Sequence, residues 1–301
     1  MNIRLVIIGN GFDLQAGLKS SFDDFFKKSE FQIIENWISF PGTANIEDVN
    51  FISLLLYNTF YRSDDTYQDK RLNIHFCEFQ KEFKSAFGFS KNPVDWMDVE
   101  SFLHALLVSK GITKMSECFE RVINHKSISD NFCICHKDFI LDFFSNSPSS
   151  KYSSCADDFY KFLFLELRRF EMRFTKYLSS EIEDNDAYLN KSNKIYNQLV
   201  ENGDIVKIIN FNYTNILKKN SSDEINVHGT LGTDIIIGIN DDNDLDEKSI
   251  QFTKTFRKLV SKESVNTLNN TIGEILIYGH SLGKQDYAYF QSIFDHYNLY
   301  T

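Results

Sequence analysis

The chain has 301 residues, 42% of them hydrophobic, and carries a formal net charge of −10. This length allows one large or two modest domains with a sizeable core, while the acidic balance gives no global footprint for nucleic acid, which we do not expect as a partner. No segment reaches the roughly 18 consecutive apolar residues of a membrane span, and the N-terminus lacks the pattern of a signal peptide. We therefore expect a cytoplasmic protein without membrane contacts.

The first predicted element is a strand over residues 3–8, an apolar run rich in β-branched side chains that ends at glycine. A Gly-x-Gly turn follows, and a helix is predicted from about Asp13. Backbone N–H groups in such a turn can approach a phosphate, so we predict a ligand contact here, against the alternative of a plain tight turn. The residues concerned are Gly9, Asn10, Gly11, Phe12 and Asp13.

Between residues 22 and 202, apolar side chains recur at steps of three and four, the pattern of amphipathic helices. Helices are predicted over 98–109, 156–178 and 182–201, and a loop or hinge over 143–155. The chain then returns to short apolar runs: we predict strands at 205–209, 225–227, 233–238 and 274–278, and helices at 254–260 and after Asp286.

These elements predict an α/β fold with a Rossmann-like parallel sheet and a large helical insertion after the first strand. The sheet domain is discontinuous, built from residues 1–21 and 203–301, and the insertion covers 22–202.

Three polar loops follow predicted strands, where open α/β sheets bind ligands. Asn210, Asn212 and Tyr213 lie in the first, which could hold ribose hydroxyls or instead cap a helix. His228 precedes a glycine in the second and could act as a general base, against a purely structural role.

The third loop, Gly279-His280-Ser281-Leu282-Gly283, matches the Gly-x-Ser-x-Gly pattern of hydrolases. Only 18 residues follow it, too few to supply the acid and histidine of that triad on later elements, so a turn that contacts a nucleotide is the better interpretation. We include Asp286 in the same predicted contact.

No metal site is predicted. The run Cys133-Ile-Cys135-His136 has a one-residue spacer, shorter than usual for zinc, and whether it binds metal stays open. The acidic loop 240–247 lacks the glycine and glutamate positions of an EF-hand and reads as a solvated loop. The odd number of cysteines, five, favours reduced thiols.

Taken together, the motifs resemble the AbiH family of bacterial abortive-infection proteins. The resemblance rests on residues 8–14, on Trp96-x-Asp98-x-Glu100, on Asn210 to Thr214, on His228-Gly229 and on Gly279 to Asp286. The same loops are similar to a distant sirtuin pattern, although Asn10 and Thr214 depart from it and the Cys-x-x-Cys zinc pairs are absent.

The sirtuin resemblance implies an NAD-type nucleotide as ligand or substrate, with no prosthetic group. Asn212 and His228 would then act in catalysis, and Ser281 would contact the adenosine end. The implied function is that of an antiphage effector that cleaves NAD or a related nucleotide. Two alternatives stay open: a non-catalytic nucleotide sensor whose insertion recruits partners, such as a phage-derived trigger or a second copy, and a nuclease.

Overall fold

A computed structural model describes residues 3–39, 48–61, 96–108, 156–200, 205–215, 224–241, 245, 247–260, 268 and 271–299 of the chain. The chain divides into two compact units. The sheet unit comprises 1–21, 171–240 and 254–301, and the helical unit comprises 22–170 and 241–253. One boundary falls within helix α9, Ala156–Ile182.

The sheet unit contains a parallel sheet of four strands in the order β3-β2-β1-β4. The strands are β1 (Ile3–Ile8), β2 (Ile205–Asn210), β3 (Glu224–Asn226) and β4 (Glu274–Tyr278). The end of β1 is buried on both faces, as its uninterrupted apolar run predicts. The predicted mixed α/β class with a parallel sheet is therefore confirmed.

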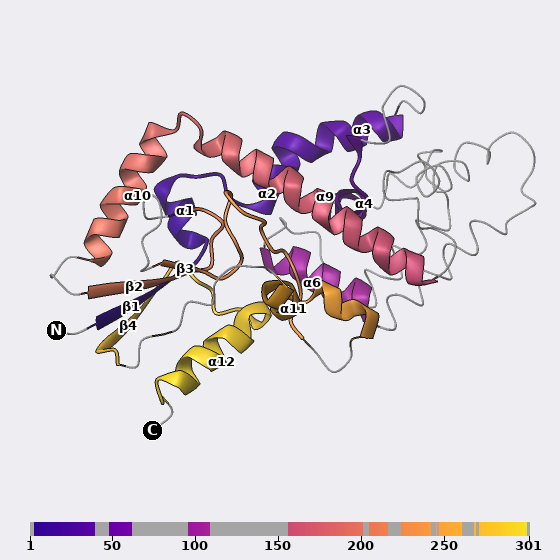
Figure 1. Cartoon of the computed structure of the whole chain (residues 1–301). Coiled ribbons are helices and arrows are strands. Elements are labelled where there is room, and N and C mark those ends of the chain that lie inside the picture. The colour runs from indigo at the N-terminus through magenta and orange to yellow at the C-terminus, as the bar shows by residue number, and fades with distance from the viewer. Residues whose placement is uncertain are drawn as a thin grey trace, which may run out of the picture. The chain divides into compact units, whose positions relative to one another are not determined.

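Helices cover both faces of this sheet (Figure 1). On one face, Val6 and Ile8 pack with residues of α1 (Gly11–Ala16) and α10 (Asp186–Leu199). On the other face, Leu5 and Ile7 pack with α12 (Tyr287–His296). The second part of α9, a short helix α11 (Lys254–Val260) and a 3-10 turn η7 (Lys284–Asp286) complete the unit's regular elements among the described residues.

Two predicted elements differ from the structure. The predicted helix 182–201 is present as α10 but begins later, at Asp186, because α9 extends to Ile182 and a turn with Asp184 at φ 57° separates the two helices. The predicted strand 233–238 is wrong: residues 235–238 are buried but join no sheet, and the Ile237 N–H donates to the Glu171 carboxylate instead of a neighbouring strand. A buried apolar run has the same sequence pattern whether it forms a strand of a sheet or an irregular buried segment.

The compact units also differ from the predicted boundaries. Residues 171–202 belong with the sheet, because Tyr188, Ile195 and Leu199 of α10 lie in the same core cluster as β1. Residues 241–253 belong with the helical unit.

The helical unit has a core of phenylalanine side chains. Phe22, Phe25 and Phe26 each contact the ring of Phe170, with ring centroids 5.7, 5.7 and 6.3 Å away. The unit's described elements are α2 (Phe22–Phe25), the π-helix η1 (Phe26–Glu30), α3 (Phe31–Ser39), α4 (Phe51–Leu56), the π-helix η3 (Tyr57–Tyr61), α6 (Trp96–Leu107), the first part of α9, and η6 (Glu247–Phe252).

Within the described ranges, no helix is long and apolar enough to cross a membrane, and no cluster of His, Cys, Asp and Glu side chains could hold a metal ion. The run Cys133 to His136 and the predicted hinge 143–155 lie outside the described residues, as does part of the acidic loop 240–247.

Candidate functional site

The Gly9–Gly11 turn lies against the loop that follows β4. The N–H of Gly9 donates to the carbonyl of Tyr278, and the N–H of Gly11 donates to the carbonyl of Gly279, at 3.0 and 2.8 Å. The N–H of Phe12 donates to the carbonyl of Gly9, at 2.9 Å. These three N–H groups, which the sequence suggested for a phosphate, are therefore already bonded within the protein.

The glycines themselves are needed for this contact between loops. A Cβ on Gly9 would lie 2.7 Å from the Gly279 oxygen and the His280 Cα, and one on Gly11 would lie 2.7 Å from the Gly279 Cα. Gly279 has φ +66°, and its Cβ would lie 2.5 Å from the Phe12 nitrogen. Close backbone approach thus explains all three glycines, and phosphate binding at this turn stays a prediction.

Most of the predicted loop after β2 is occupied by internal bonds. The Asn210 amide donates to the Thr214 carbonyl and to the Glu224 carboxylate, both at 2.7 Å, and its oxygen accepts the N–H of Asn212 at 2.9 Å. The hydroxyl of Tyr213 donates to a carbonyl at 3.3 Å. These residues shape the loop, and among the predicted residues of this loop Asn212 alone has side-chain polar atoms that bond no residue the structure describes.

Asp13 is a buried anchor for the same loop. Its carboxylate accepts hydrogen bonds from the hydroxyls of Tyr188 and Thr214, each at 2.8 Å. Burial raises the Asp13 pKa from 3.8 to about 6, although the two hydroxyls partly oppose the shift. The neighbouring Asn10 accepts a bond from the Ser20 hydroxyl at 2.6 Å. Both predicted contact residues are thus used in holding the fold.

Asn212 and His228, the two residues predicted to be catalytic, lie on adjacent segments in a buried part of the unit. They are 4% and 5% exposed. Two main-chain hydrogen bonds join the segment of Asn212 to the segment of His228, one before the two residues and one after them. The bonds run from Val227 N–H to Asn210 O at 2.9 Å and from Leu231 N–H to Tyr213 O at 3.0 Å.

Both side chains have buried polar atoms that make no hydrogen bond to any residue the structure describes. These atoms are the amide nitrogen and oxygen of Asn212 and Nδ1 of His228. Leaving such atoms unpaired costs about 1–3 kcal/mol each, so native proteins rarely do so without a reason. In this respect the predicted catalytic pair differs from Asn210 and Asp13, whose side chains bond within the protein.

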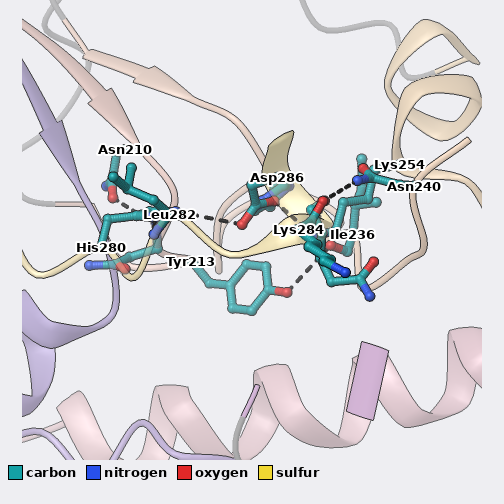
Figure 2. A network of polar contacts seen from close by, with 12 residues as sticks. Asn210, Tyr213, Ile236, Asn240, Lys254, His280, Leu282, Lys284 and Asp286 are labelled. Carbon is teal, nitrogen blue, oxygen red and sulfur yellow. Dashed lines mark hydrogen bonds and ion pairs between the residues drawn. The ribbon is translucent and has the colours of Figure 1, made fainter. Parts of the chain in front are cut away.

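Asp286 lies on the Nε2 side of His228. Figure 2 shows Asp286 with Lys254 and His280, two of the residues that contact its carboxylate. Its Oδ1 lies 3.0 Å from His228 Nε2 and accepts a bond from the Lys254 ammonium at 2.8 Å. The Nε2 of His280 lies 3.5 Å from Oδ2, and His280 Nδ1 accepts the Leu282 N–H at 2.9 Å. Three side chains from three segments therefore converge on one carboxylate.

This cluster keeps His228 neutral. Burial lowers the pKa of His228 from 6.5 to about 4, and the Lys254 charge lowers it further, against the opposing effect of Asp286. Burial raises the pKa of Asp286, but Lys254 and His228 lower it more, so that it lies well below its usual range. A carboxylate only accepts, so Nε2 carries the imidazole proton and Nδ1 presents its lone pair.

Comparison with known proteins assigns the chain to a family. The family model described as bacteriophage abortive infection AbiH matches residues 5–300. The chain belongs to the AbiH family. The resemblance seen in the sequence is thus confirmed, and AbiH membership implies a function in abortive infection by bacteriophage. No curated protein and no solved structure matches the chain.

Two other parts of the AbiH resemblance are the motif in α6 and the serine in the loop after β4. The motif Trp96-x-Asp98-x-Glu100 begins α6 in the helical unit, where Glu100 is buried. Ser281 is exposed, and the residue with strained backbone is Leu282, at φ 54°. A hydrolase elbow strains the serine itself and runs directly into a helix, so the structure does not provide that context.

The sequence reasoning missed Lys254, which is 2% exposed at its side chain. The one local signal was a lysine at the first position of a predicted helix, where the helix dipole disfavours a cation. It also missed the buried pair of Glu171 and Arg257, joined by two bonds of 2.5 and 2.8 Å. Arg257 further donates to the Ile237 carbonyl at 2.8 Å. This bond holds the segment whose Ile239 carbonyl accepts the Lys254 N–H.

Proposed function

We propose that the sheet unit binds a nucleotide of the NAD type, with a ribose at Asn212 and His228, and that the protein cleaves it as an effector of abortive infection. Membership of the AbiH family supports the link to phage. The unpaired atoms of Asn212 and His228 carry the ligand part of the proposal. Together they offer one amide donor, one amide acceptor and one imidazole acceptor to a ligand.

The topology supports a Rossmann-like sheet. The order β3-β2-β1-β4 matches the first four strands of dinucleotide-binding folds, in which ligands bind beyond the carboxyl ends of the strands. Between β1 and β4 those ends are occupied by the contact of Gly11 with Gly279. We therefore assign the ligand to the ends of β2 and β3, which Asn212 and His228 follow.

The proposed reaction needs only water as co-reactant. The bond between the nicotinamide nitrogen and the ribose C1′ breaks, and nicotinamide leaves with the electron pair. A water oxygen bonds to C1′, and its proton passes to solvent by way of a basic group. His228 Nδ1 is that group: it is unprotonated at neutral pH and accepts a hydrogen bond from the attacking water or from a ribose hydroxyl.

The test compares NAD levels in phage-infected cells that carry the wild-type chain, the Asn212→Ala/His228→Ala variant, or a control with the exposed His296 replaced by alanine. We expect NAD to fall, and nicotinamide to appear, with the wild type and the control only. Full protection by the double variant, with NAD unchanged in every strain, would reject cleavage. Binding of NAD without turnover would instead assign the sensor function.

A further inference from the structure

The residue best placed to control His228 is one that the proposed reaction does not itself use. Lys254 begins α11, and its ammonium donates to the same Asp286 oxygen that faces His228 Nε2, at 2.8 Å. The ammonium also reaches the Gln285 carbonyl at 3.4 Å. At 2% side-chain exposure, this cation is kept from water and must be held by the groups around it.

The backbone fixes Lys254 in this place. Its N–H donates to the Ile239 carbonyl at 2.9 Å, so the chain entering α11 is tied to the chain that leaves the sheet unit at Asn240. The Asn240 amide in turn donates to the Lys284 carbonyl in the turn that carries Asp286 (Figure 2). The segment that ends at Asn240 thus bonds both the start of α11, which carries Lys254, and the turn that carries Asp286.

We propose that Lys254 is a positioning residue, whose ammonium fixes Asp286 against His228 Nε2 and so leaves Nδ1 as the acceptor offered to the ligand. The inference deepens the proposed function and rests on it for the identity of that ligand. A lone carboxylate beside the imidazole would draw a second proton onto the ring, because an anion favours the imidazolium. The Lys254 charge offsets this attraction, and the imidazole stays neutral.

The other groups that face His228 do not replace Lys254. Asp286 approaches from η7, and the Tyr289 ring approaches from α12, with its centroid 5.6 Å from that of His228. The His280 ring, from the loop after β4, lies on the other oxygen of the Asp286 carboxylate. Among these described neighbours, Lys254 brings the one permanent positive charge. Removing it therefore changes the balance around His228 in a predictable direction.

The test is a histidine side-chain NMR titration of the full chain, labelled with nitrogen-15, with the His228 signals assigned by a His228→Gln variant. In the wild type we expect a neutral ring with the proton on Nε2. In Lys254→Met we expect the His228 titration midpoint to rise by about one pH unit or more. Lys254→Arg should keep the wild-type behaviour, as should Lys258→Met, a control in the same helix whose ammonium bonds the Asn226 carbonyl.

An unchanged midpoint in folded Lys254→Met would overturn the inference. If that variant does not fold, the wild type alone still decides, since a charged ring at about pH 6 or a proton on Nδ1 at neutral pH contradicts the proposal. No ligand enters this titration. If the titration gives the expected midpoints but the chain fails to bind NAD in a separate assay, the proposed function is rejected and the role of Lys254 is retained.

Discussion

Replacing Asp13 by asparagine should stabilise the protein at neutral and alkaline pH. The carboxylate is buried between the hydroxyls of Tyr188 and Thr214, and its pKa lies near 6 in the folded chain against 3.8 in the ordinary state. A group whose pKa is raised by folding stabilises the fold below the ordinary pKa, and this contribution is lost as the pH rises through the folded value. At high pH, the wild type therefore bears the cost of a buried charge.

The size follows from the shift. About two pKa units correspond to about 3 kcal/mol over the whole range, of which about 1.4 kcal/mol falls between about pH 5 and about pH 8. Asparagine keeps an acceptor for one hydroxyl, and its NH₂ can donate to the other, so the bonds survive without the charge.

The assay is urea unfolding of the wild type and Asp13→Asn at both pH values. The difference in unfolding free energy between the two proteins should grow by about 1–1.5 kcal/mol in favour of the variant on going from acid to alkaline pH. Other titrating groups cancel in this double difference. A difference that does not change with pH would refute the reasoning.

Three further results are expected. Gly11→Ala should lower the unfolding free energy by about 2 kcal/mol or more, since its Cβ would lie 2.7 Å from backbone, whereas Gly232→Ala, with its nearest contact at 3.8 Å, should be nearly neutral in urea unfolding. Arg257→Met should cost about 3–5 kcal/mol by the same measurement, because it leaves the buried Glu171 carboxylate without its cation; a loss below about 1 kcal/mol would contradict the assigned pairing. NAD binding, measured by calorimetry on folded protein, should be constant above about pH 5 and weaken toward about pH 4 as His228 gains a proton on Nδ1, and affinity that improves there would be inconsistent with an acceptor role.

Much of the sheet could be predicted from the sequence, because its signal is local. The apolar run of β1 is buried on both faces, and a run of that kind ending at glycine is typical of a central parallel strand. The segment 233–238 has the same local signal and forms no strand. Its N–H groups bond the His228 carbonyl and the Glu171 carboxylate, which is far away in the sequence, and no pattern within the segment could reveal these partners.

The candidate site divides in the same way. Asn212 and His228 could be found because they follow strands, and the ends of parallel strands meet at one edge of a sheet. The Gly9–Gly11 turn was also located correctly. Its glycines are required because the loop after β4 packs closely against them, and this contact depends on tertiary packing that the local sequence does not show. Lys254 lies on a helix and acts through Asp286, so only the folded chain brings it to His228.

The most direct test of the central claim is the affinity of the full chain for NAD, measured by calorimetry in the wild type and in Asn212→Leu. The leucine replaces an unpaired buried amide with an apolar group of similar size, so it should leave the fold intact and raise the unfolding free energy by about 1 kcal/mol. We predict that the wild type binds NAD and that this stable variant does not. Equal binding by both proteins, or no binding by the wild type, would contradict the account.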